Sequence, residues 1–234
     1  MNHRFFVPDG IEPGATIELP DDERHHARVL RVREGEEVEL FDAIGNNYVG
    51  RFADGRIEML KPSANREPRT ANCLAMSIIQ LEKFELVLQK ATELGIASFI
   101  PLITDRMELR IERVRGKEER WRKIVLEAVK QSGRSKIPPI EQPATFDEAI
   151  TRPGKKIVFE ADATQSTTDN REPATIFIGP EGGFSERELS LAKQNGAHFH
   201  NLGPRRLRAE TAAIAAATLI VLPPDGERHT LDRR

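Results

Sequence analysis

The glycine-bearing segments near the C-terminus carry the residue types best suited to holding a small molecule. Two of them stand close together in the sequence, Gly179–Gly183 (GPEGG) and Leu202–Thr211 (LGPRRLRAET). The first follows the apolar run 174–178, which is typical of a buried strand, and precedes Ser185 and Glu188, which have the spacing of a capping box. Glycine lets the backbone approach a ligand, and the amides at a helix start are free to donate. We therefore expect a ligand pocket here.

The second segment adds charge next to an apolar helix. Arg205, Arg206, Arg208 and Glu210 come directly before the run 212–222, which is almost wholly apolar. If that helix is buried, its charged N-terminal side lies at the edge of the core, where a polar cleft forms readily. A single loop of this kind is more often simple turn punctuation. Two such loops at successive strand-to-helix junctions favour a binding site.

Composition describes a globular chain without membrane segments. With 234 residues, of which 38% are hydrophobic, the chain can bury a sizeable core in one large or two small domains, and we favour two. The N-terminus lacks the apolar run of a signal peptide, and the C-terminal apolar run is shorter than the about 20 residues that span a bilayer. We expect a cytoplasmic protein. The single cysteine, Cys73, excludes an internal disulfide and is interpreted as a small core residue.

The charge balance does not by itself indicate a nucleic-acid-binding protein. The formal net charge is −2, and bulk electrostatics therefore argue weakly against RNA. Basic residues nevertheless cluster, and local clusters can hold phosphates. Any single cluster of basic residues is more often part of a solvent-exposed surface without a ligand. The clusters lie at 25–33, 120–123, 133–136 and 205–208.

The pattern of elements changes once along the chain. Up to about residue 70, short apolar pieces at 36–41, 48–52 and 56–60 alternate with turn signals, which predicts a small β-rich domain. A polar, proline-containing link follows at 62–72.

Beyond the link, strands and helices alternate. Strands are predicted near 73–81, 96–103, 156–160 and 174–178, with a helix that stops at Gly95 and a short helix introduced by Thr145 and Glu148. This alternation predicts an open, largely parallel α/β sheet with helices on its faces. Ligands bind such sheets beyond the carboxyl ends of the strands. Those ends correspond here to the loops 159–162, 179–183 and 202–208.

Missing motifs narrow the chemistry. The sequence has neither a Gly-x-Gly-x-x-Gly dinucleotide fingerprint nor a P-loop, and no Gly-x-Ser-x-Gly elbow. No His-Glu-x-x-His is present, and His198 and His200, which alternate on one strand face, lack a third ligand at a recognisable spacing. We do not expect a metal site.

A resemblance to a known family runs nearly end to end. The chain closely resembles the bacterial 16S ribosomal RNA uridine-N3 methyltransferases of the SPOUT superfamily. Lys130 departs from the family pattern, which commonly has a carboxylate there. The matching segments are 4–7 (RFFV), 26–31 (HARVLR), 89–95 (QKATELG), 127–128 with 131–134 (EA and QSGR), 179–183 and 202–211, the last two being the most specific.

The resemblance implies a domain organisation, a cofactor and partners. It implies a PUA-like RNA-binding domain over 1–70 and an α/β methyltransferase domain with a trefoil knot over 73–234. It further implies S-adenosylmethionine as cofactor, 16S ribosomal RNA or the small ribosomal subunit as substrate, and a homodimer with the target uridine near the subunit interface.

Site residues are carried over position by position. On this resemblance the cofactor is contacted mainly by backbone at strand ends. The cofactor-binding residues are Phe159, Glu160, Ala161, Ile178, Gly179, Pro180, Glu181, Gly182, Gly183, Leu202, Gly203, Leu207, Arg208 and Thr211. The RNA-binding residues are Arg4, His26, Arg28, Arg31 and Arg134.

The catalytic roles are hypotheses from charge. The sulfonium is already a strong methyl donor, so the protein mainly aligns donor and acceptor. Uridine N3 carries a proton, so a base or nearby cations must assist. We expect Glu210 to orient the substrate or accept that proton, and Arg208 or Arg134 to stabilise the uracil anion. The competing interpretation is that Glu210 simply caps the last helix and pairs with an arginine.

Two other functions stay open at this stage. One is a SPOUT methyltransferase that acts on another RNA or another atom, such as a ribose 2′-hydroxyl. The other is a non-catalytic RNA-binding or ribosome-assembly factor, against which the intact glycines of both loops argue, although a fold alone does not fix function.

Overall fold

The chain forms two compact units. The computed structural model describes residues 3–12, 14–63, 67, 71–164 and 172–221. The first unit joins residues 1–67 with 125–137, and the second joins 68–124 with 138–234. The sequence placed the boundary between 70 and 73, and the predicted link at 62–72 lies partly outside the described residues. The grouping of 125–137 with the first unit was not foreseen.

That grouping has a clear physical basis in the C-terminal half of α3 (Glu118–Ser132). The ammonium of Lys130 contacts the buried carboxylate of Glu23, and Arg4 donates to the carbonyl oxygen of Val129 at 3.2 Å. Asn47 reaches Ser135, just beyond the helix, at 2.5 Å. The last turns of this helix are therefore held by charge and hydrogen bonding within the first unit.

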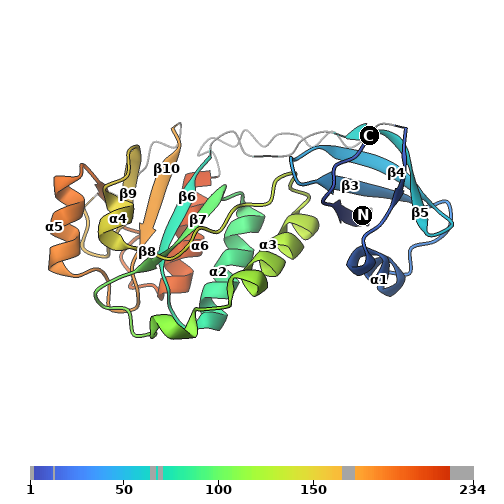
Figure 1. The fold of residues 1–234 in the computed structure, drawn as a ribbon. Helices are drawn as coiled ribbons and strands as arrows, with labels where there is room; N and C mark the ends of the chain where they lie inside the picture. Colours follow the sequence, from blue (N-terminus) through green and yellow to red (C-terminus); the bar gives the residue numbers. More distant parts are fainter. Residues whose placement is uncertain (1–2, 13, 64–66, 68–70, 165–171, 222–234) are drawn as a thin grey trace. The chain divides into compact units, whose positions relative to one another are not determined.

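The first unit is a β-rich sheet with one helix (Figure 1). The strands are β1 (Arg4–Val7), β2 (Thr16–Glu18), β3 (Glu37–Asp42), β4 (Asn47–Ala53) and β5 (Arg56–Ser63), in the order β1-β3-β4-β5-β2. β3, β4 and β5 confirm the three predicted strands, whereas β1, β2 and helix α1 (Asp21–Val29) were not assigned from the sequence. Phe5, Val38, Leu40 and Ile57 are fully buried in its core.

The second unit is built on a parallel sheet. Its strands are β6 (Cys73–Ser77), β7 (Ser98–Ile103), β8 (Ala144–Thr145), β9 (Lys155–Phe159), β10 (Ala174–Ile178) and β11 (His198–His200). They lie in the order β11-β9-β10-β6-β7-β8, and every neighbouring pair is parallel. The predicted parallel α/β sheet is confirmed.

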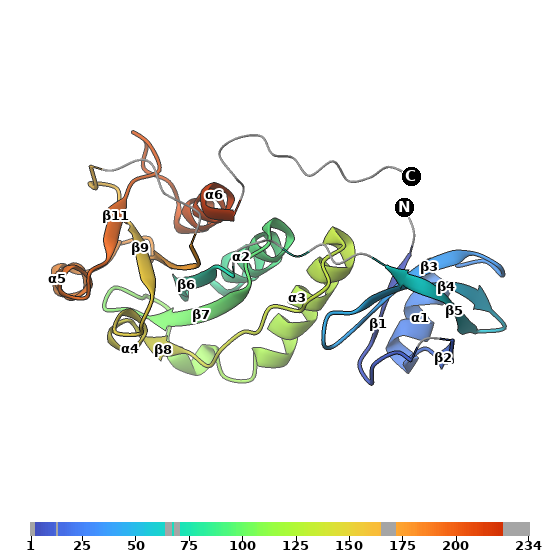
Figure 2. The same cartoon turned by 90° about the horizontal axis from the view of Figure 1, so that it is seen from above.

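Helices cover both faces of this sheet, as Figure 2 shows. The helices are α2 (Leu81–Leu94), α4 (Phe146–Ile150), α5 (Glu186–Gln194) and α6 (Ala209–Val221), with a short 3-10 turn η1 (Ile111–Arg113) before α3. Val158 and Phe177 pack toward α4 and α5 with Phe146 and Phe184. Because neighbouring strand residues point to opposite faces, the sheet can bury both sides.

Local sequence signals set the helix ends. α2 stops at Gly95, which has a left-handed φ of 110°. Thr145 with Glu148 and Ser185 with Glu188 form the two predicted capping boxes at α4 and α5. α6 begins at Ala209, earlier than the sequence indicated, so Glu210 lies inside its first turn.

The strand order reverses beside β10. The chain builds β6, β7 and β8 outward in one direction and then returns to place β10 between β6 and β9. A crevice forms where strand order reverses, at the carboxyl ends of the strands.

The trefoil knot implied by the resemblance stays a prediction. None of the described helices combines the length and the apolar character needed to cross a bilayer.

Candidate functional site

A pocket lies at the carboxyl ends of β9, β10 and β11. The space inside the pocket and its open mouth, solvent included, is about 670 Å³. The walls are mostly backbone and apolar side chains. The pocket is lined by Phe159, Glu160, Ala161, Ile178, Gly179, Pro180, Glu181, Gly183, Leu202, Gly203, Arg205, Arg206, Leu207, Ala209 and Ala212.

Most of the predicted cofactor-binding residues therefore come together in one place. The exceptions are Gly182, Arg208 and Thr211, which are not among the lining residues. The sequence assignment missed Arg205, Arg206, Ala209 and Ala212. Their signal was present, because Arg205 and Arg206 belong to the second glycine-bearing segment.

Sheet register explains why distant segments meet. Ile178 is the register partner of Phe159, and Phe159 is the register partner of His200. The three residues end neighbouring strands, so the loops that follow them leave the sheet at the same edge. Glu160 continues this row, because its amide donates to the carbonyl oxygen of His200 at 2.9 Å.

The first loop, residues 179–184, is closely packed. A Cβ on Gly179 would lie 3.2 Å from the carbonyl carbon of Gly183 and from the amide nitrogen of Phe184. Gly183 has a φ of +70°, which favours glycine, and its amide donates to the carbonyl oxygen of Pro180 at 2.9 Å. Backbone therefore packs on backbone here, and a bare main-chain wall faces the pocket.

Two basic side chains brace this loop from outside. The guanidinium of Arg106 donates to the carbonyl oxygen of Gly182 at 2.8 Å. The ammonium of Lys83 contacts the carboxylate of Glu181 at 3.3 Å. Both side chains are missing from the sequence assignment, because nothing in their local pattern points to a loop about 76 residues or more away.

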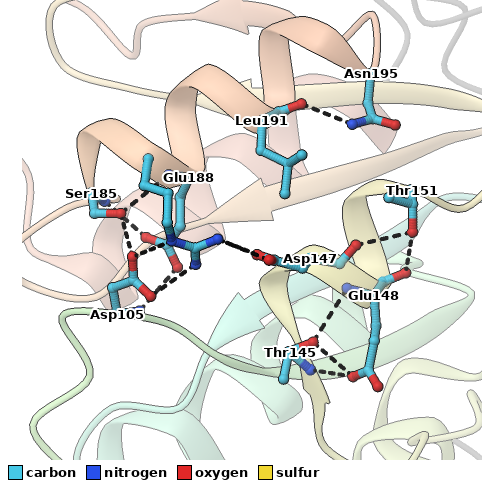
Figure 3. Close-up of polar contacts among 10 residues, drawn as sticks. Asp105, Thr145, Asp147, Glu148, Thr151, Ser185, Glu188, Leu191 and Asn195 are labelled. Carbon is cyan, nitrogen blue, oxygen red and sulfur yellow. Dashed lines mark hydrogen bonds and ion pairs between the residues drawn. The ribbon is translucent and has the colours of Figure 1, made fainter.

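A network of charges fixes the start of α5 just beyond the loop (Figure 3). Arg187 donates to both carboxylate oxygens of Asp105, at 2.9 and 3.0 Å, and also contacts Asp147 on α4. The buried carboxylate of Glu188 accepts from the amides of Asp105 and Ser185. Hydrogen bonds from Arg187 and Ser185 lower the pKa of Asp105, and the hydrogen bonds that Arg187 donates to Asp105 and Asp147 raise the pKa of Arg187.

The second loop, residues 202–208, is held through the side chain of Asn201. Gly203, with a φ of +98°, donates from its amide to the side chain of Asn201 at 3.0 Å. Asn201 in turn donates to the carbonyl oxygen of Ala163 at 2.5 Å. Arg205, Arg206 and Arg208, which follow, are exposed. This loop contributes side chains to the pocket more than a rigid wall.

Glu210 lies at the N-terminal turn of α6, next to the pocket residue Ala209. Its residue is only partly exposed, and its Oε2 atom is buried without a hydrogen-bond partner in the described part of the chain. A buried carboxylate oxygen without a partner is costly, and such groups call for an explanation. The predicted pairing of Glu210 with an arginine is not seen among the described residues.

His200 ends β11 beside the pocket residue Phe159. The two ring centroids are 6.2 Å apart, and His200 is 6% exposed. Burial, followed by the charges of His198 and Lys155, lowers the pKa of His200. The ring is therefore neutral at physiological pH and packs as part of the strand-end row.

The predicted RNA-binding residues of the first unit fall into two groups. Arg4 and Arg134 are buried: Arg4 donates to Asn47 at 2.5 Å, and Arg134 donates to Glu67 at 2.7 Å. Arg28 and Arg31 are exposed. Arg134 belongs to the unit that does not contain Glu210 and Arg208, and its guanidinium is engaged there.

The exposure of His26 is intermediate between those of the two groups. It is partly exposed and packs edge-on against Phe5, with ring centroids 6.0 Å apart. Its Nδ1 lies 3.9 Å from the carboxylate of Glu23. RNA contact by His26, Arg28 and Arg31 stays a prediction.

Metal ligation and thiol chemistry depend on the possible metal ligands of the described chain and on the single thiol, Cys73. Among the residues that the structure describes, no group of three or more His, Cys, Asp and Glu side chains could hold a metal ion. Cys73 packs against the core of the second unit, and burial raises its pKa to about 11. The thiol is therefore protonated and unreactive.

Comparison with protein families covers both units. Residues 66–221 match a family described as an RNA methyltransferase domain. Residues 19–59 match a family described as an RNA methyltransferase PUA domain.

Individual relatives extend over almost the whole chain. The chain is 35% identical to a ribosomal RNA small subunit methyltransferase E of Mesomycoplasma hyopneumoniae, covering 92% of this chain and 97% of that protein. It is 30% identical to the protein of that name from Aquifex aeolicus, over 89% and 95% of the two chains. A crystal structure of the Neisseria gonorrhoeae protein of that name, bound to S-adenosyl methionine, superposes with a TM-score of 0.85 at 31% identity, covering 93% of this chain and 95% of that one.

Proposed function

Because the chain belongs to the family of the ribosomal RNA small subunit methyltransferases E, we propose that it transfers the methyl group of S-adenosylmethionine to N3 of a uridine in 16S ribosomal RNA. The observation that carries this proposal is the backbone-lined pocket at the carboxyl ends of β9, β10 and β11. Pockets at this edge of a parallel sheet are the common ligand sites of α/β folds.

The residues of the pocket fit the cofactor. The close packing at Gly179 leaves main-chain atoms facing the ligand, and Phe159 and Leu202 offer apolar walls for an adenine ring. A relative of 31% identity holds S-adenosyl methionine in its crystal structure, which supports the same ligand here. The bound cofactor supplies a methyl group on a positively charged sulfur.

Methyl transfer to N3 of the uridine requires the N3 proton to be removed. Methylation of uridine N3 replaces its proton, so a group of the protein must take that proton or stabilise the uracil anion. The unpartnered, buried carboxylate oxygen of Glu210 supports its role as the acceptor of the N3 proton. The exposure of Arg208, two residues before Glu210, supports a role for its guanidinium in stabilising negative charge on the uracil oxygens. The earlier alternative for that role, Arg134, already binds Glu67.

The first unit has a separate part in the proposal. Its exposed Arg28 and Arg31 offer positive charge to ribosomal RNA, in keeping with its match to a PUA domain of RNA methyltransferases. A homodimer acting in the cytoplasm, where ribosomal subunits mature, completes the proposed assignment.

Two measurements test the function directly. Calorimetric titration of the protein with S-adenosylmethionine is expected to detect one site per chain. 16S ribosomal RNA from a deletion strain is expected to lack one N3-methyluridine, which returns on complementation. Mass spectrometry of the RNA measures this difference. A missing 2′-O-methyl group instead would identify a different acceptor atom. Absence of both cofactor binding and any methylation difference would leave a non-catalytic RNA-binding role.

The role of Glu210 has its own experiment. Single-turnover methyl transfer by Glu210→Gln is expected to be slower than by the wild type, because the amide cannot accept the N3 proton. Glu186→Gln is the matched control, since Glu186 is an exposed carboxylate in the first turn of α5. A wild-type rate and an unchanged pH profile for Glu210→Gln would show that Glu210 is a helix-terminal residue without a chemical role.

A further inference from the structure

The loop before α6 carries an unusual concentration of open positive charge. Arg205, Arg206 and Arg208 lie within four residues, and all three are exposed. Within the part of the chain that the structure describes, none of the three makes a hydrogen bond or an ion pair through its side chain. We call these three residues the basic rim, because Arg205 and Arg206 line the mouth of the pocket.

Other arginines at this edge of the sheet are used differently. Arg106 donates to the carbonyl oxygen of Gly182, and Arg187 is shared between Asp105 and Asp147. These guanidinium groups hold the protein together. The basic rim has no such task, so its charge is available to a ligand.

The acidic residues of the pocket do not neutralise the rim. A carboxylate oxygen of Glu160 accepts from the amide of Ala161 at 3.1 Å, and Glu181 contacts Lys83. Adjacent like charges repel, and a chain that holds three of them together without partners is poised for an anion. The start of α6 adds to this field, because a helix N-terminus favours negative charge.

We propose that Arg205 and Arg206 of the basic rim bind the phosphodiester backbone of the RNA strand on either side of the nucleotide that enters the pocket. This inference rests on the proposed function and identifies how the same site holds its substrate. An RNA strand presents one negative charge per nucleotide, which matches successive arginines, whereas the cofactor offers a single carboxylate. Leu207, between the arginines, lines the pocket, so the rim and the cofactor wall share one segment.

The experiment measures how RNA affinity depends on salt. The probe is a single-stranded 20-nucleotide segment of 16S ribosomal RNA, with wild-type protein compared with the double variant Arg205→Gln/Arg206→Gln. Each phosphate contact contributes about 0.7 to the slope of log affinity against log salt for single strands. The double variant is therefore expected to lower the slope by about 1.4 and to bind about 25-fold more weakly at 0.1 M salt. Arg205→Lys/Arg206→Lys is expected to keep the wild-type slope.

A matched control removes the same kind of charge elsewhere. Arg152 lies three residues before β9, at the amino edge of the sheet and opposite the pocket, in an exposed pair with Glu141. Arg152→Gln is expected to leave the salt slope unchanged. The melting temperature of the double glutamine variant is expected to match that of the wild type, which shows that the variant is folded.

Two outcomes would overturn the inference. An unchanged salt slope in the double glutamine variant would show that the rim does not contact phosphate. Weaker cofactor binding with unchanged RNA binding would assign the rim to the cofactor carboxylate. Failure of the wild-type protein to bind S-adenosylmethionine would instead reject the proposed function, because that measurement does not involve the rim.

Discussion

The two loops that line the pocket are built in opposite ways. Residues 179–184 are braced by Arg106 and Lys83 and are packed so closely that a side chain on Gly179 would press on backbone atoms. The loop 202–208 is held by a short chain of bonds through Asn201, and its arginines are exposed. One loop therefore supplies a fixed wall, whereas the other supplies exposed charged groups for a substrate.

The same contrast recurs inside the first unit. The buried guanidinium of Arg134 binds the carboxylate of Glu67, which also accepts from the amides of Ser135 and Lys136 at 2.7 Å. Arg31, in contrast, is exposed and has a left-handed φ of 55°. The side-chain type is the same, but burial and partners separate arginines that build the fold from arginines that are open to a ligand.

Filling the braced wall is the change with the largest expected effect. In Gly179→Ala, the new methyl group would lie 3.2 Å from backbone atoms of Gly183 and Phe184, so the loop must shift. These backbone atoms belong to residues at the pocket and must give by a few tenths of an ångström, so we expect cofactor affinity to fall by more than about tenfold, or about 1.4 kcal/mol. Calorimetry with S-adenosylmethionine measures it.

Gly182→Ala is the control in the same loop. A Cβ on Gly182 would lie 3.6 Å from Arg106, which is an ordinary contact. This variant is expected to bind the cofactor nearly as wild type does. Equal losses in the two variants would mean that loop flexibility in general, and not the close packing at Gly179, controls binding.

The second prediction concerns a buried arginine with a structural partner. Glu67→Gln removes the negative charge that contacts the buried guanidinium of Arg134, which is expected to cost about 2–3 kcal/mol of unfolding free energy at pH 7. Chemical denaturation measures the loss. Glu58→Gln, at an exposed carboxylate in β5, is the control and is expected to change stability by less than about 0.5 kcal/mol.

The same pair predicts a pH dependence with a definite sign. Burial works to raise the pKa of Glu67, but the hydrogen bond and charge of Arg134, together with the two backbone amides, outweigh it and lower that pKa below 4.5. A lowered pKa means that the stabilisation is present above about pH 4.5 and is lost as the pH falls through the folded-state value. The difference in stability between wild type and Glu67→Gln is therefore expected to shrink between pH 5 and about 3. A constant difference would contradict the assignment.

Much of the scaffold could be predicted from the sequence, because the signals are local. The runs 174–178 and 155–159 and the capping pairs Thr145–Glu148 and Ser185–Glu188 each lie within a few residues. The pocket could be predicted because parallel strands end at one edge. The braces at Lys83 and Arg106 could not, since they act across 98 and 76 residues.

The start of α6 shows another limit of sequence reasoning. Alanine at 209 and threonine at 211 both allow helix or loop, so the apolar run at 212 was the stronger signal. In the structure the helix begins at Ala209, which is buried with 5% of its surface exposed. This burial depends on tertiary packing, which the local sequence does not show. Likewise, nothing in the sequence separates the buried Arg4 from the exposed Arg28, because their burial depends on tertiary packing.

A third prediction tests the braces. Arg106→Ala removes the donor to the carbonyl oxygen of Gly182, and an exposed hydrogen bond of this kind is worth about 1 kcal/mol. Cofactor affinity is expected to fall about fivefold, with little change in the melting temperature. Arg110→Ala, at an exposed arginine of the same connection, is the control. If both variants bind the cofactor equally well, the contact between Arg106 and Gly182 does not position the wall.

The smallest expected effect is the most telling for the contrast between open and structural arginines. Arg31 occupies the left-handed position after α1, where the amide of Arg31 donates to the carbonyl oxygen of Arg28 and that of Val32 to Ala27, the bonds of a Schellman motif. Glycine is preferred there, so an arginine costs about 1 kcal/mol. Arg31→Gly is expected to raise the melting temperature by about 2–4 °C.

The same substitution removes a charge that we expect RNA to use. Arg31→Gly is therefore expected to bind single-stranded 16S ribosomal RNA with a salt slope lower by about 0.7, although the protein is more stable. Arg28→Gln is the control, because it removes a neighbouring exposed charge without relieving the backbone, and should lower the slope without raising the melting temperature. A gain in stability with no change in RNA binding would show that Arg31 is merely tolerated at this position. Opposite shifts in stability and RNA affinity would show that the strained backbone is kept for the sake of the open guanidinium, since selection for stability alone favours glycine there.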